Sequence, residues 1–277
     1  MKRFIAKSWD GEQPSMVKAI RTLARRTLPD PIRQPLGRFL APIDHYFMRP
    51  IEGLIFDLKG GLFRADGCTF AIPKHLTSRS YRACFLRGDY EEEERALIKA
   101  FLRPEDSVLE FGACLGVVSC VTNRLLRDKT RHVVVEANPK LVPCIYRNRE
   151  LNKAGFLIEH CAVSDKHEET FYLHPAFIVG GTSQRKTDLP ERLPGRSLRE
   201  LDARYGPFTA LIIDIEGSEI DVFESSRNVL EKYRLVIVEL HPWAIGGPAV
   251  QRCRDILSEA GLRHRESVGM TEAWVRD

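Results

Sequence analysis

The sequence predicts an α/β fold in which helices cover both faces of a doubly wound, mainly parallel sheet. From about residue 90 onward, short apolar segments alternate with amphipathic helical segments, which is typical of such a sheet. The last two expected strands, 262–268 and 271–275, follow each other without a helix between them. We therefore expect them to close one edge as an antiparallel pair, and we expect ligands to bind beyond the carboxyl ends of the strands.

Each element follows from its apolar spacing and its boundary residues. A small hairpin is expected first, with Asp66-Gly67 as the turn between 62–65 and 69–72. The expected strands are 107–111, 132–136, 156–163, 209–214, 234–240, 262–268 and 271–275, and the expected helices are 90–102, 116–127, 139–152, 197–205, 218–230 and 248–260. Residues 174–196 are expected to form a long loop. The seven strands predict one Rossmann-like sheet, in a domain spanning residues 90–277 that follows a helical and β-hairpin appendage spanning residues 1–89.

The composition indicates an ordinary globular chain. Of its 277 residues, 43% are hydrophobic and 29% are charged, and no apolar run approaches the roughly 20 residues that a membrane-spanning helix needs. The seven cysteines form no C-x-x-C pair, so free thiols in the cytoplasm are expected. No basic and aromatic face indicates nucleic-acid binding.

Positive charge is concentrated at the N-terminus, where residues 1–50 contain ten Lys or Arg and four Asp or Glu. Within this arm, residues 16–28 have helical period, with an apolar face and a basic face. Such a helix suits peripheral contact with an anionic membrane or a lipid-linked substrate. It equally suits packing on its own domain or on a second subunit in a homodimer.

A glycine-containing loop follows the first strand of the main domain, in V-L-E-F-G-A-C-L-G (residues 108–116). Gly112 and Gly116 allow the backbone to turn tightly and to approach a ligand closely. A dinucleotide fold would need G-x-G-x-x-G, but Cys114 replaces the middle glycine. Glu110 suits a positively charged ligand instead, such as the amino group or sulfonium of S-adenosylmethionine. The loop therefore predicts this cofactor.

Two more acidic positions support a nucleoside-containing ligand. Glu136 ends the next strand, where a carboxylate accepts hydrogen bonds from both ribose hydroxyls, although a glutamate here also suits a helix cap. Ser164 and Asp165 follow the third strand, where Asp165 is placed to accept from an adenine amino group. A Ser-Asp pair also forms ordinary turns.

These motifs together resemble the FkbM-type family of class I methyltransferases, over about residues 90–242. The resemblance includes V-E-A-N-P (135–139), C-A-V-S-D (161–165), I-I-D-I-E-G-S-E (212–219) and V-I-V-E-L-H-P (236–242). It implies S-adenosyl-L-methionine as cofactor, and its motifs add Ala113, Ala137, Asn138 and Asp214 to the cofactor-binding residues Glu110, Gly112, Cys114, Gly116, Glu136, Ser164 and Asp165. It also implies O-methylation of sugars, glycolipids or natural products. The family pattern is G-A-N-x-G, so Cys114 departs from it.

Acidic residues and one histidine follow the fourth and fifth strands, and methyl transfer to a hydroxyl gains from a base or a metal. We expect His241 to be the general base, with Asp214 or Glu216 orienting it or binding a substrate hydroxyl. Asp214 and Glu239 are candidate ligands for a divalent cation such as Mg²⁺. Glu216 also suits the start of a helix by charge alone, and His241 also suits the start of a loop.

The leading hypothesis is thus an O-methyltransferase that acts on a hydroxyl of a sugar, glycolipid or other small-molecule acceptor. An N- or C-methyltransferase would share every cofactor residue and differ only in its acceptor. A nicotinamide-dependent dehydrogenase is disfavoured by Cys114. A binding subunit without turnover would keep the cofactor loop and lack the chemistry.

Overall fold

The computed structural model describes residues 44–173, 181–182 and 186–277, which fall into two compact units. The larger unit comprises residues 62–78 and 91–277, and the smaller one comprises 79–90 and the described residues up to 61. The predicted basic helix at 16–28 lies outside the described residues. No helix of the described part is both long enough and apolar enough to cross a membrane.

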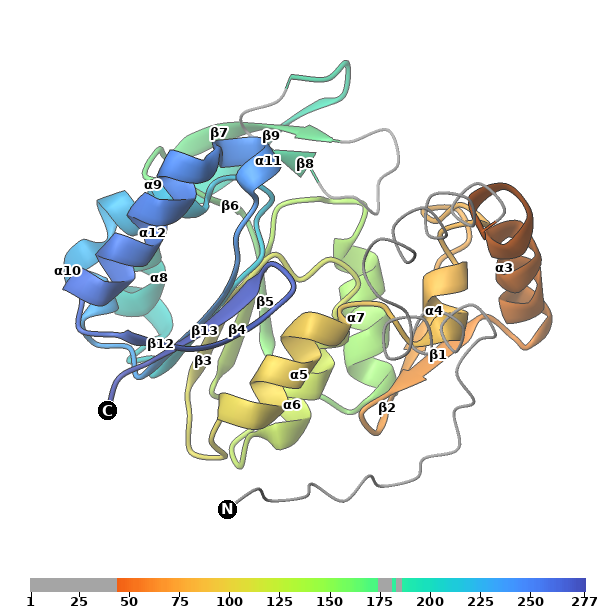
Figure 1. Cartoon of the computed structure of the whole chain (residues 1–277), viewed down its shortest axis with the longest axis horizontal. Helices are drawn as coiled ribbons and strands as arrows, with labels where there is room; N and C mark the ends of the chain where they lie inside the picture. The colour runs from red at the N-terminus through yellow and green to blue at the C-terminus, as the bar shows by residue number, and fades with distance from the viewer. Residues whose placement is uncertain (1–43, 174–180, 183–185) are drawn as a thin grey trace, which may run out of the picture. The chain divides into compact units, whose positions relative to one another are not determined.

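A seven-stranded sheet forms the centre of the larger unit (Figure 1). Its strands are β3 (Val108–Phe111), β4 (His132–Glu136), β5 (Leu157–His160), β10 (Ala210–Ile213), β11 (Leu235–Glu239), β12 (Arg263–Val268) and β13 (Thr271–Val275). The strand order is β12-β13-β11-β10-β3-β4-β5, and β13 runs antiparallel to both of its neighbours. The order reverses between β3 and β10, which is where such sheets bind ligands. The predicted doubly wound, mainly parallel sheet is confirmed.

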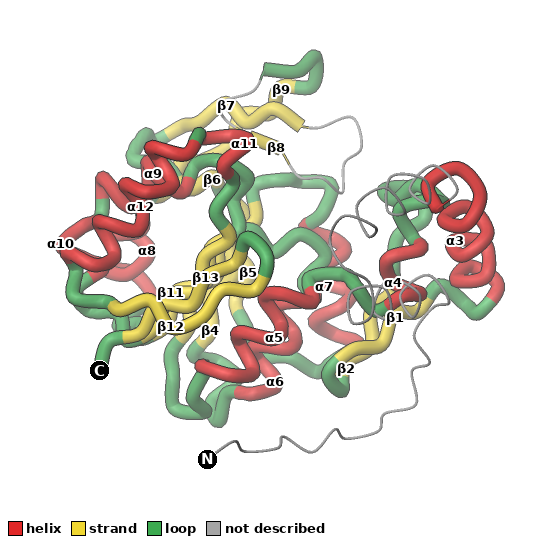
Figure 2. The backbone as a smooth tube through the Cα atoms, viewed as in Figure 1, coloured by secondary structure: helices red, strands yellow, loops and turns green. Residues whose placement is uncertain are grey.

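Helices cover both faces of this sheet, and Figure 2 shows the strands as a band with helices on either side. They are α5 (Glu92–Phe101), α6 (Val117–Leu125), α7 (Val142–Leu151), α8 (Leu198–Tyr205), α9 (Glu219–Ser225), α10 (Arg227–Leu230), α11 (Pro242–Ile245) and α12 (Gly247–Glu259). Strand alternation separates two cores. Leu109 and Phe111 pack with α8, α9, α10 and α12, whereas Val108 packs with α5 and α6.

A second sheet of four strands was not expected from the sequence. It comprises β6 (Ala162–Val163), β7 (Glu168–Leu173), β8 (Gly181–Thr182) and β9 (Pro190–Arg196), in the order β6-β9-β7-β8. The prediction of one long loop over 174–196 is therefore wrong for 181–182 and 190–196. Pro190 and Pro194 disfavour a strand prediction for β9, and its pairing with β7 is seen only in the structure.

The predicted hairpin is confirmed as β1 (Leu62–Ala65) and β2 (Cys68–Ala71). Its turn residues Asp66 and Gly67 have φ angles of 49° and 76°, as a type I′ turn requires. By its contacts the hairpin belongs to the larger unit, because β2 packs against α6 and α7. The expected domain boundary between residues 89 and 90 stays a prediction.

The smaller unit contains a π-helical turn η1 (Asp44–Met48), α3 (Arg49–Leu58) and α4 (Ala83–Arg87). Phe56 of α3 stacks on Phe85 of α4, with ring centroids 5.7 Å apart. Two ion pairs also join the two helices: Asp57 binds Arg82, and Glu52 binds Arg87.

Candidate active site

The loop after β3 is held tightly against the end of β10. Gly112 has a φ of 87°, and a Cβ added there would lie 1.6 Å from the carbonyl oxygen of Asp214. Gly112 N donates to the carbonyl of Val135, and Asp214 N donates to the carbonyl of Phe111. Only glycine fits this close approach of two backbones. The loop over residues 112–116, the cofactor loop, is therefore fixed at the point where the strand order reverses.

Gly116, with a φ of 74°, ends the cofactor loop and begins α6. Between the two glycines, Cys114 has a φ of 48°, in the left-handed region that side chains other than glycine, asparagine and aspartate seldom adopt. Its backbone N–H donates to Glu136 Oε2 at 2.9 Å. The sequence departure at Cys114 thus coincides with a strained backbone position.

Glu136 lies where a ribose-binding carboxylate was expected, at the end of β4 beside the cofactor loop. Its second oxygen, Oε1, accepts from Asn138 N at 2.7 Å. Burial raises the pKa of Glu136 to about 7, although these two backbone N–H groups favour its ionised form. The carboxylate is therefore oriented and close to its titration midpoint near neutral pH.

Glu110 is buried in the protein at the end of β3. Its side chain is 1% exposed, and its two oxygens contact Ser119 Oγ and His132 Nε2, the latter at 3.1 Å. These contacts link β3 to α6 and β4. The expected contact of Glu110 with the cofactor stays a prediction.

The remaining predicted cofactor residues lie in two groups. Asn138 is fully buried and its side chain accepts from Lys140 N, while Ala137 O contacts His160 and Ala113 is buried in the loop. Ser164 Oγ donates to Glu169 in the four-stranded sheet, so its hydroxyl already has a partner. Asp165 is exposed. The cofactor-binding roles of Ser164 and Asp165 stay predictions.

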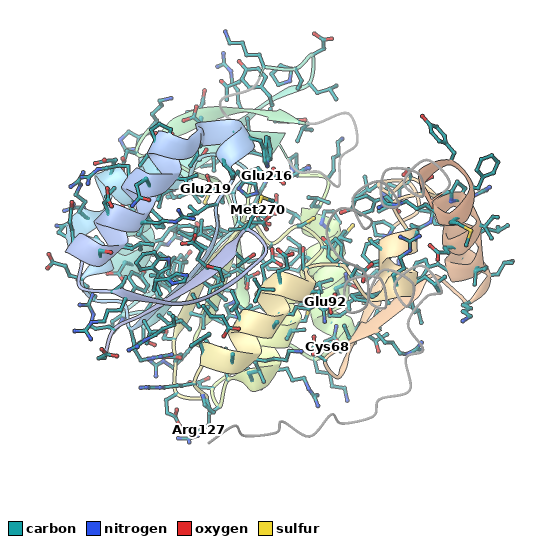
Figure 3. The ribbon with its side chains drawn as sticks, in the orientation of Figure 1. Cys68, Glu92, Arg127, Glu216, Glu219 and Met270 are labelled. Atoms are coloured by element: carbon teal, nitrogen blue, oxygen red, sulfur yellow. The ribbon has the colours of Figure 1, made fainter. Side chains whose placement is uncertain are left out.

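On the other side of Asp214, a histidine and a glutamate form a buried pair. His241 Nδ1 lies 2.7 Å from Glu219 Oε1, and the two side chains are 3% and 0% exposed. Glu219 begins α9 after β10, and His241 precedes α11 after β11. We expected Asp214 or Glu216 to orient His241, but Glu219 makes the hydrogen bond. Figure 3 labels Glu216 and Glu219 at this end of the sheet.

The other ring nitrogen of His241 faces three carboxylates. Nε2 lies 3.5 Å from Asp214 Oδ1, 3.6 Å from Glu239 Oε1 and 3.9 Å from Glu216 Oε2. Each of these distances exceeds a good hydrogen bond, and Asp214 Oδ1 is buried without a hydrogen-bond partner among the described residues. The predicted residues Asp214, Glu216, Glu239 and His241 are thus brought together, with Nε2 at their centre.

Glu94 of α5 joins this group and was missed by the sequence analysis. Burial and a hydrogen bond with Glu94 raise the pKa of Glu239 to about 10, and burial followed by the Glu94 and Glu216 charges holds the pKa of Asp214 well above its usual range. In the sequence, the four glutamates at 91–94 indicate only the start of the helix expected over 90–102, where acidic residues suit the helix dipole. The position of Glu94 beside β10 and β11 depends on tertiary packing, which the local sequence does not predict.

The backbone is strained where it presents this group of carboxylates. Glu216 has a φ of 55°, and Gly217, with a φ of 111°, lies so close to α11 that a Cβ added there would be 2.8 Å from Ala244. Non-glycine residues in this region cost about 1–3 kcal/mol each and cluster at functional sites. The D-I-E-G turn therefore places Glu216 at an energetic cost.

Two sets of side chains in this region have ligand atoms close enough together to hold one cation. Ligand atoms of Asp214, Glu216 and His241 lie within 4.8 Å of one another, as do those of Glu94, Asp214 and Glu239. Carboxylate oxygens are the ligands that Mg²⁺ prefers, and a histidine ligand commonly donates its other N–H to a carboxylate, as Glu219 would accept here.

Comparison with known protein families identifies the family of this chain. The profile of the methyltransferase FkbM domain matches residues 110–263. The chain belongs to this family. It is accordingly a methyltransferase that uses S-adenosylmethionine, and the matched range spans the cofactor loop, Glu136 and the carboxylates around His241.

Several solved structures are similar in fold. A precorrin-6y C5,15-methyltransferase from Geobacter metallireducens is 10% identical, with 75% of this chain and 94% of that chain covered and a TM-score of 0.44. The O-methyltransferase TomG from Streptomyces achromogenes, in complex with S-adenosylmethionine, is 19% identical, with 66% and 79% covered and a TM-score of 0.42. An O-methyltransferase from Bacillus cereus, in complex with S-adenosylhomocysteine, is 16% identical, with 93% and 97% covered and a TM-score of 0.41. At these scores they carry no information about the acceptor. A search of curated proteins gave no significant match.

Proposed function

We propose that this FkbM-family protein is an O-methyltransferase that acts on a hydroxyl group of a sugar, glycolipid or natural-product acceptor. One observation carries the proposal. The backbone of Asp214 contacts Gly112 of the cofactor loop, while its side chain faces His241 Nε2. A single residue therefore links the loop that would bind the cofactor to a buried histidine suited to accept a proton.

The Glu219–His241 pair supplies the acid–base chemistry in this proposal. In this pair Glu219 accepts a hydrogen bond from the Nδ1–H group of His241, so the lone pair of Nε2 points toward the acceptor. S-adenosylmethionine, when bound, supplies an activated methyl group on sulfur. With the activated methyl group supplied by the cofactor, His241 Nε2 would take the proton from the acceptor hydroxyl as its oxygen attacks that methyl group.

Glu136 and the cofactor loop would hold the cofactor. Glu136 lies beside the loop with both oxygens oriented by backbone N–H groups, so it is suited to accept from ribose hydroxyls. Asp165, which is exposed beyond β6, is the candidate for the adenine amino group. Gly112, Ala113, Cys114 and Gly116 supply a backbone surface against which the cofactor would pack.

Turnover of the His241→Asn variant tests the base. S-adenosylhomocysteine release is measured over a panel of hydroxyl acceptors, with amine and carbon acceptors and NAD included for the rival functions. We expect His241→Asn to lower the rate about 10²- to 10⁴-fold, because a positioned general base contributes this much. His264→Asn, at an exposed histidine of β12, is the matched control and should keep the wild-type rate. An unchanged rate in His241→Asn would remove this residue from the mechanism.

A divalent cation is a second candidate feature of the same site, with Glu94, Asp214 and Glu239 as ligands, which leaves His241 Nε2 free to act as the base. The close approach of their oxygen atoms favours it, since clustered carboxylates need either shared protons or a cation. When bound, Mg²⁺ would stabilise the acceptor oxygen as it loses its proton. Activity that is unaffected by exhaustive chelation would exclude the cation.

The predicted cytoplasmic location is supported only by the chemistry of the seven cysteines, all of which are free. Residues 1–43 are not described, so a membrane contact through the predicted helix at 16–28 stays a prediction, as does the homodimer.

A further inference from the structure

The smaller unit presents an apolar helix face to solvent. The exposed side chains of η1 and α3 include Phe47, Ile51, Leu54, Ile55 and Leu58, which are 66%, 53%, 42%, 38% and 78% exposed. Their spacing of three and four residues puts them along one side of the helix, the α3 apolar face. Scattered exposed apolar residues are ordinary, but a contiguous stripe over three turns marks an interaction surface.

The two acidic residues of α3, Glu52 and Asp57, point inward instead. Asp57 makes two bonds of 2.8 Å with Arg82, and Glu52 accepts from Arg87 at 2.6 Å, with all four side chains largely buried. Gly53 packs so closely on the unit that a Cβ there would lie 1.8 Å from the carbonyl of Arg79. Rotating α3 to bury its apolar side would break both ion pairs, and a broken buried pair is strongly destabilising. The outward direction of the apolar face is therefore fixed.

Charge indicates what would cover this face. Residues 1–43, which lead directly into η1, contain nine Lys or Arg and three Asp or Glu. The two acidic residues of α3, Glu52 and Asp57, are already paired with arginines. Two copies of the chain meeting at this face would bring two strongly basic arms together. An anionic lipid surface satisfies both features, because it offers an apolar layer beneath negative headgroups.

We propose that the α3 apolar face inserts into the interface of an anionic lipid bilayer. This attachment is peripheral and is independent of the acceptor and of the methyl-transfer chemistry. Interfacial binding of this kind gains strength from both buried apolar area and charge attraction.

Co-sedimentation of the full chain with vesicles tests the proposal. The lipids are phosphatidylcholine alone and phosphatidylcholine mixed with phosphatidylglycerol. We expect binding to the mixed vesicles, weaker binding to the neutral ones, and a decrease in binding to the mixed vesicles at high salt. The triple variant Ile51→Ser/Leu54→Ser/Leu58→Ser should lower partitioning into the mixed vesicles by at least about tenfold, because three apolar anchors are lost.

The matched control is Leu125→Ser/Leu151→Ser/Leu157→Ser, which removes three exposed leucines from the larger unit and should leave partitioning unchanged. Light scattering and thermal denaturation of both triple variants accompany the assay. The proposal is overturned if wild type does not bind mixed vesicles, or if the α3 triple variant binds them as wild type does. It is also overturned if the α3 substitutions instead dissociate an oligomer, or lower the Tm of a chain that binds no vesicles, since the face would then be covered by a second copy or by this chain itself.

Discussion

Cys114 differs from the family pattern in residue type, and its backbone has a φ angle that cysteine seldom adopts. Its φ of 48° lies in the left-handed region, which asparagine tolerates better than cysteine because its short polar side chain can bond locally. The family pattern has asparagine here. The geometry of the loop therefore explains the family preference, and the thiol occupies the position at a cost.

We accordingly expect Cys114→Asn to stabilise the protein by about 1 kcal/mol, through relief of this backbone strain. The free energy of unfolding is measured by urea denaturation. Cys144→Asn, within the regular helix α7, is the control and should give no gain. Equal effects of the two substitutions would show that the backbone at residue 114 is not strained.

Glu136 leads to a prediction about pH. Its pKa is raised to about 7, whereas its ordinary value is 4.5, so the native state holds a proton that the unfolded state releases. This group should therefore make the free energy of unfolding fall as pH rises from about 4.5 to about 7. Cofactor binding should change in the opposite direction, because ribose hydroxyls donate to the ionised carboxylate.

We expect the affinity for S-adenosylhomocysteine to rise about tenfold between pH 6 and pH 8, as the ionised fraction of Glu136 increases. Calorimetric titration at the two pH values measures the change. Glu136→Gln should bind more weakly and lose the pH dependence. A variant that kept the wild-type slope would assign that slope to another group.

At the scale of elements, α7 connects the hairpin to the cofactor loop through one buried side chain. Asn148 Oδ1 accepts from Ala71 N of β2, and its Nδ2 donates to the carbonyl of Leu115, both at 2.8 Å. Asn152 bonds to Thr69 N and O in the same strand. These amides replace the partner strand that β2 would otherwise need, so the hairpin helps to position the loop.

Asn148→Ala should destabilise the protein by about 2–3 kcal/mol, because it leaves a buried N–H and a buried carbonyl without partners. It should also weaken S-adenosylhomocysteine binding, since Leu115 lies in the cofactor loop. Urea denaturation and calorimetry measure the two effects. Asn228→Ala, which removes an exposed amide bonded to Arg199, is the control. Similar stability of both variants would contradict the proposed coupling.

Elements with a strong local period were predictable, and those defined by distant partners were not. The strands β3, β4, β10 and β11 follow from their apolar character, and α8, expected over 197–205, begins in the structure with a capping box formed by Ser197 and Glu200. The four-stranded sheet escaped prediction because Pro190 and Pro194 disfavour a strand, and β9 forms only by pairing with β6 and β7.

For the whole molecule, topology brings together residues that are far apart in the sequence. The sheet order places the ends of β3 and β10 side by side, so that residues 112 and 214 touch. The sequence therefore allowed Asp214, Glu239 and His241 to be predicted as neighbours, because they follow two adjacent strands. It could not reveal that Glu110 is enclosed by Ser119 and His132. Nor could it reveal that Glu94, in a helix that precedes the first strand of the sheet, contacts Glu239 at the end of β11.

We propose that cofactor binding and acceptor activation lie on the two sides of Asp214. Calorimetric titration of wild type and His241→Asn with S-adenosylhomocysteine tests it most directly, since it needs no knowledge of the acceptor. We predict one binding site in each protein, with the same affinity. Absence of binding by wild type, or loss of binding in His241→Asn, would contradict the claim.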